Sequence, residues 1–132
     1  MSRSRMVTVA GVGVAGLMVC VAAFQVLLAA GVPWGRAAYG GQSADLPPEL
    51  RISSAVAAVL WLMFAAVILR RAGLVGWAPV PASWVRPLAW VVVALSAAAT
   101  VLNAITPSPI ERAIWLPAAA VMLIGTVVVA RS

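Results

Sequence analysis

Polar side chains able to bind or react with a ligand are rare in this chain, and most lie near the ends of long apolar runs. Of 132 residues, 64% are hydrophobic and 9% are charged. Amide, hydroxyl and charged groups beside aromatic rings are typical of small-molecule pockets, which are mostly apolar with a few orienting polar groups. The residues that fit this description, and that form our candidate ligand site, are Gln25, Trp34, Tyr39, Gln42, Arg51, Ser54, Asn103, Glu111 and Trp115.

Few residues suited to catalysis or metal binding are present. Histidine is absent, and the single cysteine, Cys20, lies inside an apolar run, so neither a disulfide nor the usual His and Cys metal sites can be assembled. Ser54 beside Glu111 is the one speculative pairing of a nucleophile with a base. We therefore expect no catalytic residue, no metal and no cofactor, and we favour a protein that is not an enzyme.

Four apolar segments determine the expected architecture. A mean hydropathy of +1.09 lies far outside the range of soluble domains. Runs of about 20 to 24 residues give helices of roughly 30 to 36 Å, which matches a bilayer core of about 30 Å. The sequence predicts an all-α integral membrane four-helix bundle, a single domain over 1–132, with helices at about 7–30, 50–71, 86–105 and 110–130.

The distribution of arginines predicts the orientation in the membrane. All nine basic residues are arginines, and they are scattered without a basic face, which argues against nucleic-acid binding. Six would share one side of the membrane, namely Arg3, Arg5, Arg70, Arg71, Arg86 and Arg131. The other side would carry Arg36, Arg51 and Arg112, with the acids Asp45, Glu49 and Glu111. The positive-inside rule then predicts cytoplasmic termini (N-in/C-in) and an outer loop between the first two helices.

That outer loop, residues 31–49, is rich in glycine and aromatic residues, and we call it the lid. A stretch of eleven residues contains four glycines together with Pro33, Trp34 and Tyr39. This composition predicts tight turns that lay aromatic rings on the mouth of the bundle. Two interpretations stay open: a ligand-binding lid, or an interfacial plug that seals the bundle. Further along, Ser108, Pro109 and Glu111 form a capping-box pattern that predicts the start of the fourth helix.

The polar residues concentrate in the outer halves of the predicted helices. The inner halves contain mainly glycine, alanine and valine, so we expect dense packing toward the cytoplasm and a polar cup beneath the lid. Arg51 and Glu111 are expected to form an ion pair between the second and fourth helices. Gln25 would serve as an interhelical hydrogen bonder or as a ligand contact, and Trp61 as core filler or as the floor of a pocket.

Two outer-face sequences carry a resemblance to known proteins. The run GVPWGRAAYGGQSADLPPELRISSAVAA and the later SPxERxxWxP, from Ser108 to Pro117, resemble a family of small four-helix bacterial membrane proteins without an assigned activity. The match would cover nearly the whole chain. The resemblance implies a multi-pass protein of the bacterial plasma membrane and no particular function.

Two functional hypotheses follow. The first is a binding or accessory module whose outer cup recognises a membrane lipid, an apolar small molecule or a membrane-protein partner. The second is a transporter or channel formed by a homo-oligomer, because the four-helix size is similar to that of small multidrug resistance exporters. Those exporters carry an essential acid in their first helix, where this chain has Gln25, and an ionisable residue within the membrane is the expected mark of proton-coupled transport. We therefore favour the binding module.

Overall fold

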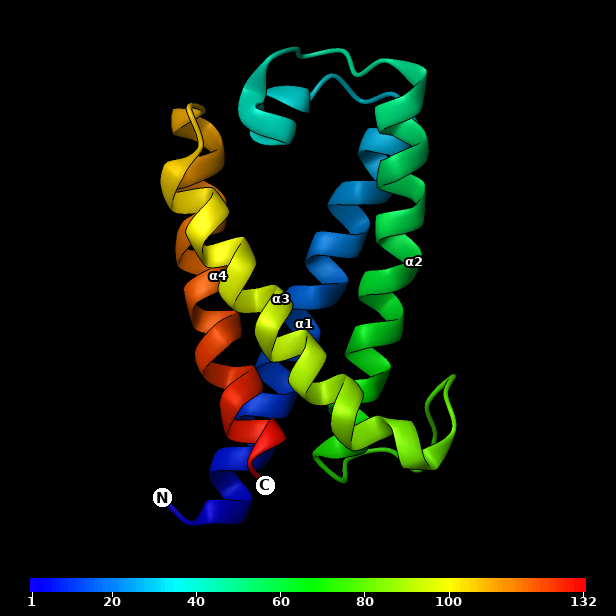
Figure 1. Cartoon of the computed structure of the whole chain (residues 1–132), viewed down its shortest axis with the longest axis vertical. Coiled ribbons are helices and arrows are strands. Elements are labelled where there is room, and N and C mark those ends of the chain that lie inside the picture. Colours follow the sequence, from blue (N-terminus) through cyan, green and yellow to red (C-terminus); the bar gives the residue numbers. More distant parts are fainter.

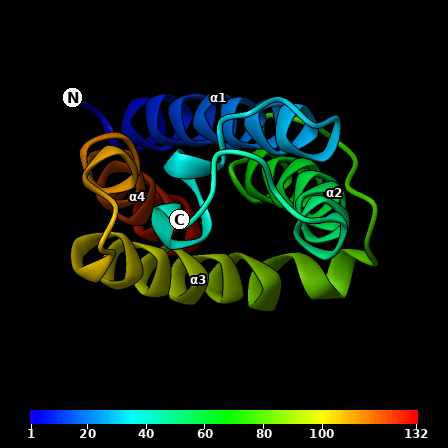
Figure 2. The same ribbon diagram turned by 90° about the horizontal axis from the view of Figure 1, so that it is seen from above.

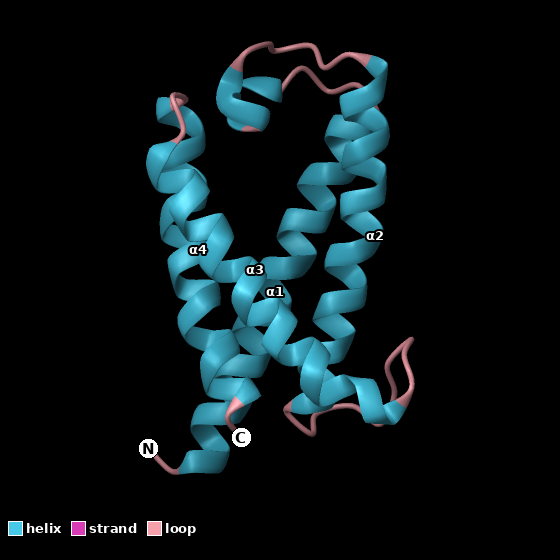
Figure 3. Cartoon of the chain, viewed as in Figure 1, coloured by secondary structure: helices cyan, strands magenta, loops and turns pink.

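The computed structural model describes all 132 residues and is entirely helical, without strands (Figure 3). Three short 3-10 turns, η1 (Gly35–Ala37), η2 (Tyr39–Gly41) and η3 (Ala82–Trp84), lie in the connections. The long helices are α1 (Arg3–Ala29), α2 (Pro48–Arg71), α3 (Val85–Ile105) and α4 (Pro109–Ala130) (Figure 1). All four are long and apolar enough to cross a membrane, which confirms the expected segments.

Helix boundaries follow local capping chemistry. α1 begins at Arg3, earlier than expected, because the Ser2 hydroxyl accepts a hydrogen bond from the Arg5 amide. α2 begins at Pro48, so the lid ends at Pro47. At the start of α4, Ser108 Oγ accepts from the Glu111 amide at 3.2 Å, which confirms the predicted cap. The reciprocal half of the capping box is absent, because the Glu111 carboxylate binds the lid instead.

The helices form two pairs that diverge from one end of the bundle. α1 packs chiefly against α2, and α3 against α4, while α1 and α4 also meet. Figure 1 shows these pairs close together near both termini and apart at the opposite end, where the lid lies. Seen from above, the short turns of the lid lie over the space that the four helices enclose (Figure 2). We call the two ends the terminal end and the lid end.

The hydrophobic core occupies the terminal end. Met18, Ile68 and Val129 are fully buried there. A Cβ atom added at Gly125 would collide with Val14 Cγ2, and one added at Gly11 would lie 3.0 Å from Ala72 Cβ, so small residues permit the close helix contacts. The core cluster comprises Val14, Ala15, Met18, Ala65, Ile68, Ala89, Val92, Met122, Val129 and Ala130. Dense packing at one end of the bundle is thereby confirmed.

The outer surface of the bundle is apolar. Only 25 of the 132 residues are buried, and large side chains such as Ile52, Ile105 and Ile124 are 66%, 71% and 67% exposed. Such extensive exposed apolar surface is far larger than soluble monomers tolerate and suits contact with lipid chains.

Candidate functional site

The lid folds back over the bundle through an unusual run of backbone conformations. Tyr39, Gly40 and Gly41 have φ values of +50°, +79° and +71°, in the left-handed region that glycine adopts most readily. Gly41 also lies against α4, since an added Cβ would be 2.6 Å from Ser108 Cβ. A Cβ at Gly35 would collide with a lid backbone carbonyl. The predicted tight turn is confirmed, and it needs these glycines.

One face of α4 holds the backbone of the lid. Ser108 Oγ donates to the Arg36 carbonyl at 2.6 Å, and Trp115 Nε1 donates to the Ala37 carbonyl at 2.8 Å. Between them, Glu111 Oε2 accepts the Gly40 N–H at 2.9 Å. Ser108, Glu111 and Trp115 are three and four residues apart, which puts all three on one side of the helix. The start of α4 is therefore the docking surface of the lid.

Tyr39 connects the lid to α2. Its phenolic oxygen lies 2.9 Å from Ser54 Oγ and donates to the Leu50 carbonyl at 3.3 Å. Ser54 is fully buried, so this bond satisfies a hydroxyl that would otherwise lack a partner. Within the lid, Arg36 Nη1 donates to the carbonyls of Gly41 and Gln42 at 2.9 and 3.2 Å. The lid is thus fixed to α2, to α4 and to itself.

A cavity of about 190 Å³ lies beneath the lid. It is bounded by all four long helices and by both short turns of the lid, and eleven of its fourteen lining residues are hydrophobic. The lining comprises Val21, Phe24, Gln25, Ala37, Ala38, Tyr39, Trp61, Ala99, Asn103, Glu111, Trp115, Ala118, Ala119 and Met122. The polar cup expected from the sequence coincides in position with this cavity, although most of the cavity wall is apolar.

Polarity changes along the depth of the cavity. Gln25 lies near the end of α1, Asn103 near the end of α3 and Glu111 in the first turn of α4, all at the lid end. Met122, which also belongs to the core, lies about 16 Å farther along α4 than Glu111 at about 1.5 Å per residue. The cavity therefore has a polar rim beneath the lid and an apolar floor.

The three polar residues of the rim differ in the groups that they leave free. Gln25 Oε1 is enclosed by protein atoms and has no hydrogen-bond partner. Asn103 Nδ2 donates to the Ala99 carbonyl at 2.7 Å, which leaves its amide oxygen available. The Glu111 carboxylate accepts one lid N–H and retains further acceptor sites. Asn103 and Glu111 thus provide the rim with acceptor oxygens that no protein donor uses.

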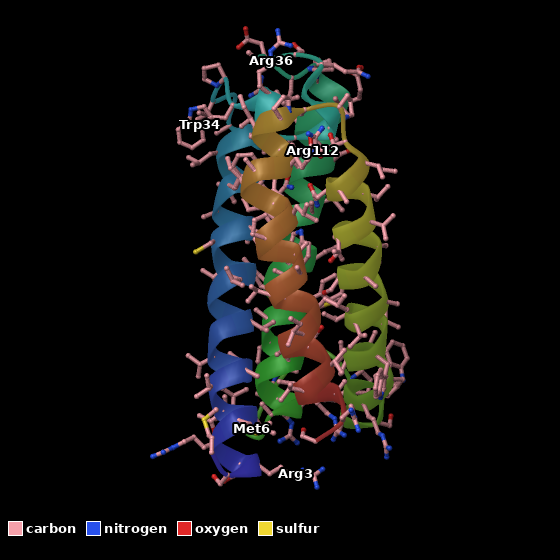
Figure 4. All side chains as sticks on the ribbon, turned by 90° about the vertical axis from the view of Figure 1, so that its left-hand side faces the viewer. Arg3, Met6, Trp34, Arg36 and Arg112 are labelled. Carbon is pink, nitrogen blue, oxygen red and sulfur yellow. The ribbon has the colours of Figure 1, made fainter.

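Five of the nine candidate residues line the cavity: Gln25, Tyr39, Asn103, Glu111 and Trp115. Ser54 lies behind Tyr39 and supports it. The other three candidates do not line the cavity. Gln42 is exposed on the lid, and Trp34, 53% exposed, projects away from the bundle (Figure 4).

Arg51 is also exposed, and the expected ion pair between Arg51 and Glu111 is wrong. Arg51 Nε donates to the Ala29 carbonyl at 3.0 Å, at the end of α1. Its guanidinium lies over Gly31, where an added Cβ would be 3.3 Å from Nη2. The last carbonyls of a helix lack intrahelical donors and form its negative pole, so a neighbouring arginine is drawn to them. Arg51 caps α1, and Glu111 binds the lid.

The sequence interpretation missed the lining residues without polar groups. Alanines at 37, 38, 99, 118 and 119 provide the space, and Phe24 packs against Trp115 with ring centroids 4.9 Å apart. Trp61 serves both of its proposed roles, since it meets Phe64 edge-on at 6.0 Å and lines the cavity. The one sequence signal for this cavity is the presence of alanines opposite polar residues in the bundle, because the small side chains leave space between the helices.

Comparison with models of known families, with curated proteins and with solved structures finds no match to this chain. The chain also has no group of three or more His, Cys, Asp or Glu side chains arranged to hold a metal ion.

Proposed function

We propose that this chain is a non-enzymatic binding module that holds a small apolar or amphipathic molecule in the cavity beneath its lid. The observation that carries this proposal is the construction of the cavity, with apolar walls from four helices and three polar residues at one end. A volume of about 190 Å³ is sufficient for a compact organic molecule. An apolar cavity of about 150 Å³ binds benzene.

The arrangement of polar groups favours binding over catalysis. Ser54, which the sequence pairs with Glu111 as a nucleophile with its base, lies against Tyr39 and does not line the cavity. The rim groups that line the cavity are two amides and one carboxylate, which can orient a ligand but include no nucleophile paired with a base.

We further propose a multi-pass location in a bacterial plasma membrane with both termini cytoplasmic. Six of the nine arginines belong to the terminal end, and the positive-inside rule assigns that end to the cytoplasm. The lid and its cavity then face outward. The resemblance of the lid and of the start of α4 to bacterial four-helix membrane proteins supports the same assignment.

A cavity-filling variant tests the binding role. In Ala118→Phe the new ring would occupy the cavity, whereas Ala113→Phe adds the same ring on the exposed side of α4. Native mass spectrometry of each protein, extracted with its own membrane lipids, reports both the oligomeric state and any retained molecule. The wild type and Ala113→Phe should carry a discrete added mass that Ala118→Phe lacks.

Two outcomes would contradict the proposal. A mass retained equally by Ala118→Phe would mean that the molecule binds the outer surface rather than the cavity. Wild-type protein with no added mass, in a ring-shaped oligomer, would favour the channel hypothesis instead.

A further inference from the structure

The carboxylate of Glu111 has no cationic partner in the protein. Its side chain lines the cavity, and its one donor is the neutral Gly40 N–H. Every side-chain hydrogen bond from an arginine goes to a backbone oxygen, and none goes to Glu111. Arg112, its neighbour in sequence, is exposed and donates to the Thr106 carbonyl at 2.7 Å (Figure 4). The N-terminus of α4 favours this negative charge, but the charge has no ion-pair partner in the protein.

Asn103 adds an acceptor from a second helix. Its amide oxygen on α3 is available, whereas Gln25 Oε1 on α1 is enclosed by protein atoms. Glu111 on α4 and Asn103 thus offer oxygen atoms from two helices to one space. An ammonium group provides up to three N–H donors and no acceptor, so it matches this rim.

Aromatic rings complete the environment of the rim and the floor. Phe24 and Trp115 form a tilted pair at 4.9 Å, and Tyr39 and Trp61 also line the cavity. The faces of such rings attract cations and also provide apolar surface for the body of a ligand. An anionic ligand would meet the carboxylate and find no arginine among the lining residues.

From this combination we propose that the cavity selects a small organic cation, with an ammonium head at Glu111 and Asn103 and an apolar body toward Trp61 and Met122. The inference rests on the proposed binding function, because it names the ligand class of the same cavity. The volume of about 190 Å³ limits the body to roughly the size of one substituted aromatic ring.

Three probes of similar size and different charge test the inference. Phenethylammonium is cationic, propylbenzene neutral and 3-phenylpropionate anionic at neutral pH. Their affinities would be measured from changes in tryptophan fluorescence of the protein in lipid nanodiscs, with Ala118→Phe as the background for partition into lipid. Phenethylammonium should bind about ten-fold more tightly than propylbenzene, as expected for one charge-assisted hydrogen bond, and 3-phenylpropionate should bind most weakly.

Removal of the charge should abolish this preference. In Glu111→Gln the affinities for phenethylammonium and propylbenzene should become equal within about two-fold, because the apolar floor is unchanged. The control is Glu49→Gln, which removes an exposed acid from the first turn of α2 outside the cavity and should retain the full preference. The wild-type ranking of the three probes does not use Glu111→Gln, so it tests the inference even if that variant fails to fold.

The outcomes separate this inference from the proposed function. Equal affinity of wild type for the cation and the neutral probe, or tightest binding of 3-phenylpropionate, would overturn the cation preference and leave the binding role intact. Absence of cavity binding by all three probes would overturn both.

Discussion

The terminal end and the lid end of this bundle are stabilised by different interactions. At the terminal end, close contacts between glycine, alanine and branched side chains fill the space, as where Gly125 faces Val14. At the lid end the helices diverge, and hydrogen bonds from Ser108 and Trp115 to lid carbonyls hold the structure around a cavity. Close packing thus stabilises the terminal end, while hydrogen bonds stabilise the lid end around the cavity.

The two ends are therefore expected to differ in how easily they deform. Close packing resists deformation, so the terminal end acts as a rigid base for four helices. A lid held by a few hydrogen bonds can open at a much smaller free-energy cost, because a typical hydrogen bond contributes about 1 kcal/mol to stability. Ligand entry is therefore expected at the lid end while the base stays folded.

The largest effect is expected from a cavity created in the base. Ile68→Ala, at a fully buried position, should lower the free energy of unfolding by about 2 kcal/mol or more, because packing contacts are lost and not replaced. Ile52→Ala on the same helix, at a position 66% exposed, should change it by less than about 0.5 kcal/mol. Denaturant titration in detergent measures both, and equal losses would contradict a packed base.

A smaller and more local effect is expected when one lid contact is removed. Ser108→Ala loses the bond to the Arg36 carbonyl and the cap on the Glu111 amide, at a cost of about 1 to 2 kcal/mol. Hydrogen exchange should accelerate in residues 35–41 and stay unchanged in the core of the base. Ser53→Ala, at an exposed serine, should resemble the wild type. Exchange that accelerates equally at both ends would show that the two are not independent.

The smallest effect is expected at Arg51. Arg51→Ala should cost about 0.5 kcal/mol, because an exposed side chain at a helix C-terminus contributes little. Combined with Glu111→Gln, its effect should be additive within about 0.5 kcal/mol, since the two side chains bind different partners. A coupling above 1 kcal/mol would restore the ion pair as the correct interpretation.

The sequence predicts the parts of this structure that depend on residue type alone. Apolar runs give the four helices, Ser108 gives the cap of α4, and polar residues at one end indicate the cup. The errors concern Arg51 and the lid contacts. In the structure the partners are backbone atoms, such as the Ala29 and Ala37 carbonyls, which every residue possesses and which carry no sequence signal. Arg51 and Glu111 carry opposite charges at the same end of the bundle, so their side-chain chemistry alone predicted an ion pair between them.

Because the lid docks on α4, the lid can reach its final position only after the fourth helix has been synthesised. The contacts of Gly40, Arg36 and Ala37 with Glu111, Ser108 and Trp115 span 71, 72 and 78 positions of the chain. During synthesis the first two helices therefore leave the ribosome with a lid whose docking surface does not yet exist. The cavity forms only after the fourth helix joins the bundle, because α4 supplies part of its wall. A chain released after α3 would consequently lack both this wall and the docking surface of the lid.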